Sequence, residues 1–451
     1  MSIFIVLILL TIGTLVFHFM SPWYFTPIAS NWTLIDTTVD ITFVVCGIIF
    51  IAVNLFLAWC IYKYHHKKVV TADYEPENKK LESWLTIITA IGVTAMLAPG
   101  LFVWASFVET PKEAYQIEAV GQQWQWSFRF PGKDGKLGTT GVQFINTDNP
   151  FGMNTQDPNG NDDIVVNHNR LHLPINKPVK VLLRSKDTLH NFTVPEFRVK
   201  MDLVPGMMTF LWFTPTKLGE YEILCEELCG IGHHAMRGRV IVQTEEDFQG
   251  WLASQQTFAQ TQKTTKLAGN AARGEKLYAV CSSCHGADGL GNTTLNSPKL
   301  TGLDGHYLLR QLVHFKKSIR GNSDEDIYGK QMIAMAATLP DENAMRDVIS
   351  YIQSLPNKPS KATVAGDPSR GKKLFETCSA CHGLDGRGKI SQHAPRLSGM
   401  NDDYLVRQIK NYRDGVRGTH PYDMQGAQMR LMSLMDDGRI NDLVAYINTL
   451  Q

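Results

Sequence analysis

The chain has 451 residues, which is too long for one ordinary hydrophobic core, so several domains are expected. Its 44 basic and 43 acidic residues leave a formal net charge of +1, which gives no support for nucleic acid as a partner. The apolar residues are spread unevenly, and their distribution indicates that the N-terminal part is bound to a membrane.

Two N-terminal stretches have the length and composition of membrane-spanning helices. Ile41–Tyr62 and Leu85–Val108 contain no Asp, Glu, Lys or Arg, and both exceed the roughly 20 residues that a helix needs to cross a bilayer. The loop between them carries Lys63, Lys67, Lys68, Lys79 and Lys80. The positive-inside rule therefore places this loop in the cytoplasm and everything after Glu109 outside it. We expect a transmembrane hairpin over 38–109.

Ile3–Met20 is a third apolar run. It lacks both a positively charged start and a small-residue cleavage site, so an extra membrane helix is favoured over a signal peptide. Either reading makes 1–37 an N-terminal apolar segment followed by an external loop.

After the hairpin, the hydrophobic period becomes that of short strands. Candidate strands are Tyr115–Phe130, Lys180–Arg184, Met208–Phe213 and Gly238–Val242, separated by clusters of Gly, Pro, Asn and Asp. This spacing predicts a β-sandwich or small barrel over 110–253. The polar stretch 254–270 is predicted to be a flexible linker.

An internal repeat follows, with an offset of 97 residues. The matching segments are Arg273-Gly274 with Arg370-Gly371, Cys281–His285 with Cys378–His382, Tyr307–Gln311 with Tyr404–Gln408, and Met332 with Met429. Two copies indicate tandem modules, because a solenoid needs three or more repeats. We expect one small helical domain over 271–356 and another over 368–451, with a linker at 357–367.

The sharpest local motif runs from Cys225 to Met236. Two cysteines four residues apart are followed by His233 and Met236, and thiolate, imidazole and thioether ligands suit copper. Two cysteines can bridge two copper ions, which then need a second imidazole, and His190 in a β-rich segment upstream can provide it. A zinc site or a disulfide is the alternative for the cysteines alone.

The pattern Cys-x-Glu-x-Cys-x3-His-x2-Met, with Asp-x2-His-x-Phe-x-Val-Pro upstream, resembles the CuA domain of cytochrome c oxidase subunit II. The resemblance covers the membrane hairpin and the β domain. It implies a cupredoxin-like Greek-key sandwich that carries a dinuclear copper centre on its loops. The implied ligands are the bridging Cys225 and Cys229, His190 and His233 on one copper each, Met236 as a weak axial ligand and the carbonyl of Glu227.

The same resemblance suggests roles for three further groups. The Glu227 side chain is implied to face a magnesium ion at the interface with subunit I. Trp124, in Gly121–Trp126, matches the tryptophan that accepts electrons from a cytochrome c in that family, whereas the residues alone favour ordinary packing. Glu82 matches a glutamate at a proton-channel mouth, and Trp84 is one position early against that pattern.

Each repeat opens with Cys-x2-Cys-His, the signature for covalent attachment of c-type haem. The attachment cysteines are Cys281, Cys284, Cys378 and Cys381, and the proximal iron ligands are His285 and His382. A zinc or redox site is disfavoured because two copies occur on the export side of a membrane protein.

The distal iron ligand is expected among paired methionines. Met332 and Met335 form one pair, and Met429 and Met432 form the other. The first member of each pair lies 47 residues after its haem histidine. The repeats resemble tandem two-haem bacterial cytochromes c, in which that first methionine binds iron, so we expect Met332 and Met429 to be ligands.

Together these features predict the subunit through which electrons enter a terminal respiratory oxidase in a bacterial inner membrane, with its soluble domains in the periplasm. Electrons would pass from cytochrome c or an upstream respiratory complex through two haems and CuA to subunit I, and subunit III is a further expected partner. Two alternatives are a CuA subunit of a nitric-oxide reductase and a membrane-tethered electron carrier without an oxidase. The oxygen-reducing site is expected in another subunit.

Overall fold

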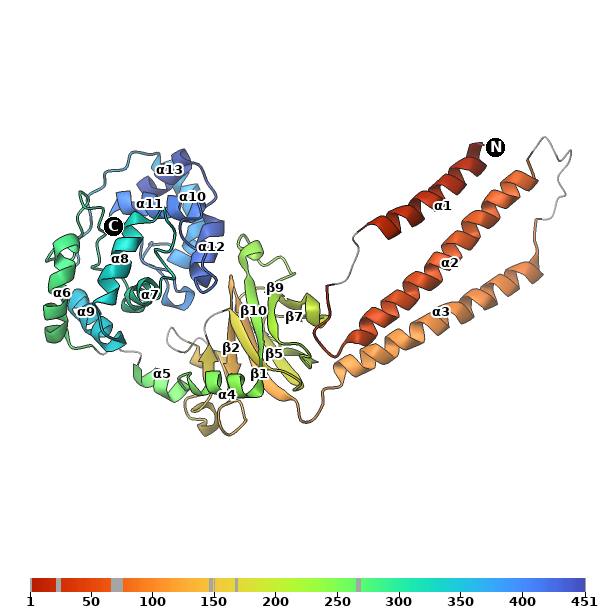
Figure 1. The fold of residues 1–451 in the computed structure, drawn as a ribbon, viewed down its shortest axis with the longest axis horizontal. Helices are drawn as coiled ribbons and strands as arrows, with labels where there is room; N and C mark the ends of the chain where they lie inside the picture. The colour runs from red at the N-terminus through yellow and green to blue at the C-terminus, as the bar shows by residue number, and fades with distance from the viewer. Residues whose placement is uncertain are drawn as a thin grey trace.

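The computed structural model describes residues 2–21, 26–65, 76–145, 149, 151–166, 169–264 and 269–450. Lys67 and Lys68 of the predicted cytoplasmic loop lie outside these residues. Within the described part, the chain forms three long helices, a β-sandwich and two helical domains (Figure 1).

The N-terminal helices are α1 (Ser2–Met20), α2 (Thr33–Lys63) and α3 (Lys79–Val108). Each is long and apolar enough to cross a membrane, and most of their large apolar side chains are exposed, as lipid-facing residues would be. Helix α1 packs along α2, and α2 and α3 form a hairpin (Figure 1). The predicted hairpin is therefore present, with a third membrane-length helix before it.

The hairpin is joined to the β domain through tryptophans at its outer end. The indole Nε1 of Trp32 donates to the Trp212 carbonyl at 3.1 Å, and Trp212 Nε1 donates to the Ser106 carbonyl at 3.2 Å. Arg198 forms an ion pair with Asp36 at 2.7 Å. These contacts fix the sandwich directly above the ends of α2 and α3.

The β domain consists of two five-stranded sheets. One has the order β3-β2-β1-β5-β8 and the other β4-β10-β9-β6-β7. The strands are β1 (Tyr115–Gln122), β2 (Gln125–Phe130), β3 (Ile164–Val166), β4 (Arg170–Pro174), β5 (Val179–Ser185), β6 (His190–Val194), β7 (Val199–Leu203), β8 (Thr209–Phe213), β9 (Gly219–Leu224) and β10 (Arg237–Gln243). Strands β1 and β5, and β10 and β4, pair in parallel, and the remaining pairs are antiparallel.

Large aromatic side chains fill the space between the sheets. Trp126, Phe128, Phe192 and Phe213 are fully buried there, because alternate residues of each strand point inward. All four predicted strand segments are present, and Tyr115–Phe130 is a hairpin of two strands. The sandwich agrees with the cupredoxin-like fold that the sequence predicts.

The predicted linker at 254–270 is wrong in its first part. Helix α4 (Glu245–Ala253) is followed by α5 (Phe258–Thr264), and Phe258 is buried against Val120, Phe151 and Met153. Phe258 gives this otherwise polar stretch an anchor on the sandwich, which a compositional argument overlooks.

The helical domains repeat one arrangement. The first contains α6 (Ala271–His285), α7 (Gly305–Lys316), α8 (Ile327–Ala337) and α9 (Glu342–Ser354). The second contains α10 (Pro368–His382), α11 (Asp402–Arg413), α12 (Met424–Met432) and α13 (Asp437–Ile447). Helices α6 and α9 pack together, as do α10 and α13. Gly274 and Gly371 permit this close helix packing. A Cβ on Gly274 would lie 1.9 Å from the carbonyl oxygen of Asp347, and a Cβ on Gly371 would lie 1.9 Å from that of Asp442.

Candidate metal centre and haem sites

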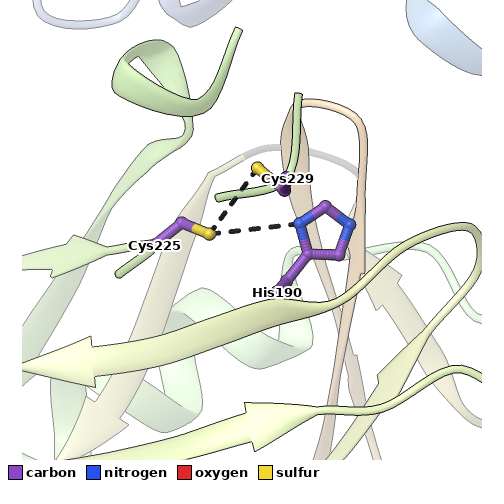
Figure 2. A group of neighbouring side chains, drawn as sticks. All are labelled: His190, Cys225 and Cys229. Atoms are coloured by element: carbon purple, nitrogen blue, oxygen red, sulfur yellow. Dashed lines mark hydrogen bonds between the residues drawn. The ribbon is translucent and has the colours of Figure 1, made fainter. Parts of the chain in front are cut away.

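The loops at one end of the sandwich bring the predicted copper ligands together. His190 is the first residue of β6, Cys225 follows β9 directly, and Cys229 lies further along the same loop (Figure 2). His233 opens the short helix η4 (His233–Ala235), and Met236 precedes β10. Residues 46 positions apart in the sequence thus meet because β6 and β9 are paired neighbours in one sheet.

The ligand atoms face one another at short range. Cys225 Sγ lies 3.8 Å from Cys229 Sγ and 4.0 Å from His190 Nδ1 (Figure 2). Cys229 Sγ lies 3.5 Å from His233 Nδ1 and 3.9 Å from Met236 Sδ. The carbonyl oxygen of Glu227 lies 3.4 Å from Cys225 Sγ. The other four groups of the predicted ligand set are therefore gathered around the two cysteine sulfurs.

Neighbouring groups prepare these side chains to bind a metal. The Nε2 atom of His190 hydrogen-bonds to the Asp187 carboxylate at 2.7 Å. A carboxylate accepts, so this nitrogen carries the proton and the lone pair of Nδ1 points at Cys225. A hydrogen bond from Cys229, working against burial, lowers the pKa of Cys225 to about 3. A thiolate beside imidazole and thioether groups fits copper.

Trp124 lies directly over the cysteine loop. Its indole Nε1 donates to the Cys229 carbonyl at 3.2 Å, and Gln123 Nε2 donates to the same oxygen at 2.8 Å. A Cβ on Gly232 would come within 2.3 Å of the Trp124 ring, so the ring rests on that glycine. Trp124 is 8% exposed. Its position is compatible with both roles considered for it, packing and electron transfer.

Glu82 is far from this cluster. It lies in the first turn of α3, whereas Ser106, near the other end, contacts the β domain. At 1.5 Å per residue the two positions are separated by roughly 35 Å along the helix. Glu82 is exposed, and its role at a channel mouth stays a prediction.

The Glu227 side chain joins no second group of metal ligands. Within the described part of the chain, the cluster of histidine, cysteine and carboxylate groups close enough to share an ion is His190, Cys225 and Cys229. The magnesium ion expected at Glu227 therefore has no support among the residues that the structure describes, and it stays a prediction for the assembled complex.

Both predicted haem histidines are oriented by a backbone carbonyl. Nδ1 of His285 hydrogen-bonds to the Pro298 carbonyl at 2.8 Å, and Nδ1 of His382 to the Pro395 carbonyl at 2.8 Å. A carbonyl only accepts, so Nδ1 carries the proton and Nε2 is left free to bind iron. Burial lowers the pKa of each histidine, which keeps it neutral as a ligand must be.

One cavity runs through both helical domains. In the first domain it is lined by Cys281, His285 and Met332, and in the second by Cys378, Cys381, His382, Met429 and Met432. Cys284 lies beside it on the exposed side of the last turn of α6. Three of the four predicted attachment cysteines, both histidines and the first methionine of each pair thus line a shared space.

Buried arginines between the domains are the functional residues that the sequence interpretation missed. Arg320 donates to Gln311 Oε1 at 2.6 Å and to Gln408 Oε1 at 3.0 Å. Arg417 donates to Gln408 Oε1 at 2.7 Å and to Gln311 Oε1 at 2.9 Å. Both arginines line the cavity, and the Nε atom of each is buried without a partner.

The unpartnered Nε atoms of these two buried arginines provide a test of whether haem fits the cavity. The buried carboxylate of Asp423 offsets only one of the two charges. A further anion would therefore be favourable, and haem carries two propionate groups that Arg binds well. The signal was present in the sequence, because Gln311 and Gln408 and also Arg320 and Arg417 are separated by the repeat offset of 97. The donor set of each domain therefore fits a c-type haem.

A second pair of contacts has the same symmetry. Arg310 donates to the His393 carbonyl at 2.7 Å, and Arg407 donates to the Asn296 carbonyl at 2.7 Å. The two arginines and their two partners are again separated by 97 residues. The domains therefore face each other across a pseudo-twofold axis, with the same surface used on both sides.

Comparisons with known proteins agree with a copper-type β domain followed by two cytochrome-type helical domains. Residues 115–244 match the family model "Cytochrome C oxidase subunit II, periplasmic domain", and 271–356 and 368–451 each match the cytochrome c model. The alternative cytochrome c oxidase subunit 2 of Bradyrhizobium diazoefficiens is 56% identical over 259 residues, which are 57% of this chain and 94% of that protein. The chain belongs to the cytochrome c oxidase subunit II family, with two cytochrome c domains following the subunit II region.

The C-terminal part has relatives of its own. Cytochrome c4 of Azotobacter vinelandii is 33% identical over 165 residues, 33% of this chain and 75% of that protein. The crystal structure of cytochrome c4 from Pseudomonas stutzeri covers 41% of this chain and 100% of its own, with 29% identity and a TM-score of 0.34. The subunit II periplasmic domain of Bradyrhizobium japonicum covers 32% and 96%, with 28% identity and a TM-score of 0.24.

Family membership establishes the general role. The chain is an oxidoreductase component, a cytochrome c oxidase subunit with a copper-binding type of β domain and haem-binding type of cytochrome domains. Its membrane-length helices and periplasmic-type domain indicate a membrane protein whose soluble part faces the periplasm.

Proposed function

We propose that this chain receives electrons from a cytochrome c or an upstream respiratory complex and passes them through two c-type haems and a dinuclear CuA centre to subunit I. The observation that carries the proposal is the cluster around Cys225 and Cys229. Two sulfurs 3.8 Å apart, each with its own imidazole, supply the ligand set of a dinuclear site. A CuA centre, when bound, supplies one-electron transfer with little structural change.

The chain's own residues define how this site works. Asp187 holds the His190 ring so that Nδ1 faces the sulfurs, and Met236 lies beside Cys229. Burial of both cysteines excludes water from the site, which limits the reorganisation that charge transfer would otherwise require. In each cytochrome domain, His285 or His382 presents Nε2, and we propose Met332 and Met429 as the axial ligands opposite them.

The proposed setting is the bacterial inner membrane, with subunits I and III as partners and the oxygen-reducing site in subunit I. The Lys63, Lys79 and Lys80 ends of α2 and α3 would face the cytoplasm. The sandwich would then sit on the periplasmic surface of the membrane, where subunit I can reach the cysteine loop.

The deciding experiment is purification of the membrane complex through this chain. We expect two covalent haems on this polypeptide, a mixed-valence copper EPR signal, a multi-span partner with haem a, and oxygen consumption driven by reduced cytochrome c. Haem b with nitric-oxide turnover would favour a nitric-oxide reductase instead. Purification of this chain alone, redox-active but without oxygen consumption, would identify a membrane-tethered carrier and contradict the proposal.

A further inference from the structure

The second cytochrome domain packs on the β domain beside Trp124. Helix α12 contacts η4, which carries His233, at the tip of the sandwich (Figure 1). Gln428 Nε2 donates a hydrogen bond to the Trp124 carbonyl at 2.5 Å. Cys381 packs against the hydrophobic cluster to which Trp124 belongs. The interface thus joins a predicted haem-attachment residue to the tryptophan above the cysteine loop.

A second contact supports the same interface. The guanidinium group of Arg170 lies 4.9 Å from the centre of the Tyr422 ring, just before α12. Glu220 holds Arg170 in place through an ion pair at 2.8 Å. A cation–π contact of this kind orients the loop before α12 on the sandwich.

The two contacts connect the proposed cofactor ligands by a short path. Gln428 directly precedes Met429, the proposed axial ligand of the second haem. Trp124 accepts from Gln428 through its carbonyl and donates through its indole to the carbonyl of Cys229, a proposed bridging ligand. The cavity of the second domain also reaches Trp124, Gly232 and Ala235. Gln428 and Trp124 thus link the lining of the second haem cavity to the cysteine loop.

The first domain offers a direct comparison because of the repeat. The residue that corresponds to Gln428 is Gln331, next to Met332, and the residue that corresponds to Tyr422 is Glu325. Both are exposed. Among the described residues, a hydrogen bond joins a cytochrome domain to the sandwich, and it comes from the second domain. Gln428 is half-buried at the contact with the sandwich, whereas Tyr422 stays largely exposed, as Glu325 is, so the two domains differ chiefly at Gln428.

We infer that electrons leave the two cytochrome domains only through the second one, whose helix α12 is docked on Trp124 through Gln428. External donors then deliver electrons to the cytochrome domains rather than to Trp124. This rests on the proposed function. In the step concerned, one electron leaves the ferrous haem of the second domain, which becomes ferric, and reduces the oxidised copper pair by one electron, and no bond forms or breaks. Gln428 is a positioning residue, and the order is first domain, second domain, copper.

The burial of Trp124 supports the second half of the inference. At 8% exposure, with α12 against it, Trp124 offers almost no surface to a soluble protein. The arginine pair across the domain interface places the two haem sites within one continuous cavity. An electron delivered to the first domain can therefore pass to the haem site of the second domain.

The test compares matched substitutions in the intact complex. Gln428→Ala and Gln331→Ala remove the same side chain from equivalent positions, and Tyr422→Ala and Glu325→Ala form a second pair. After photoreduction of the haems, transfer to copper is followed at the near-infrared copper band. We expect Gln428→Ala to slow haem-to-copper transfer about two- to tenfold, the factor that corresponds to one lost hydrogen bond in docking, and Gln331→Ala to leave it unchanged.

A second readout does not depend on turnover. Backbone hydrogen exchange in the loop 228–236 and in α12 is expected to become faster in Gln428→Ala and Tyr422→Ala, and to match the parent in the two control variants. Unchanged transfer and exchange in both second-domain variants, with haems and copper band intact, would overturn the inference while leaving the proposed function standing. A parent complex without covalent haem or the copper band would overturn the proposed function itself.

Discussion

Arg320 and Arg417, 97 residues apart in the sequence, donate hydrogen bonds to the same oxygen, Gln311 Oε1, at 2.6 and 2.9 Å. Buried like charges repel each other, and the buried carboxylate of Asp423 offsets only one of the two charges, so a further anion would be favourable here. The buried and unpartnered Nε atoms of both arginines line the cavity in which the haems are expected. Propionate groups are the anions that such a haem would bring.

Replacing Arg417 should therefore lower a haem potential. A positive charge near the iron favours the reduced form, so Arg417→Gln is expected to lower the midpoint potential of one haem by on the order of 60 mV, since a charged hydrogen bond contributes about 1.5 kcal/mol. Arg320→Gln should act similarly on the other haem. Redox titration of the visible haem bands measures both. Arg413, which is half-buried and paired with Asp414 and Asp437, provides the control, and an equal shift in Arg413→Gln would contradict this explanation.

Replacing Cys229 should remove the dinuclear copper centre. Cys229 lies within 4 Å of Cys225, His233 and Met236, so a single hydroxyl cannot replace its contacts to two metal ions. Cys229→Ser is expected to abolish the mixed-valence EPR signal and the near-infrared band while both haems remain attached. Cys46→Ala, in membrane helix α2, should leave both signals unchanged. A persistent mixed-valence signal in Cys229→Ser would exclude the bridging role.

Replacing the proposed axial methionine should affect one haem only. Met429 and Met432 both line the cavity, but in the first domain the lining includes Met332, the counterpart of Met429, and does not include Met335, the counterpart of Met432. A methionine ligand raises haem potential, so Met429→Ala is expected to lower the potential of the second haem and to make its ferric form high-spin. Met432→Leu, which preserves volume, should change neither. If Met432→Leu changes the potential and spin state and Met429→Ala does not, Met432 rather than Met429 is the iron ligand.

The sequence predicts those features of the structure that depend on residues close together in the chain, and misses those that depend on residues far apart. Local patterns suffice for the membrane helices, the strand segments and the ligand loop, and the 97-residue repeat identifies both haem motifs. Phe258 shows where composition fails, because a single apolar residue anchors a polar stretch to the sandwich. The contact of Arg320 with Gln408 and the docking of Gln428 on Trp124 join residues 88 and 304 positions apart, which no local pattern encodes.

Gly232 connects the cysteine loop to Trp124, and its replacement is expected to disturb both. An added Cβ would lie 2.3 Å from the Trp124 ring, which is held between this glycine and the Cys229 carbonyl. Gly232→Ala should therefore displace the ring and destabilise the β domain by roughly 1–3 kcal/mol, the usual cost of overpacking a filled site. Thermal unfolding and Trp fluorescence measure the two effects. Gly250→Ala is the matched control, because a Cβ there meets no atom within 4 Å and alanine favours the helix α4. If Gly232→Ala unfolds like the parent and keeps its fluorescence, the ring does not rest on this glycine, and the contact between the copper loop and Trp124 is looser than the structure indicates.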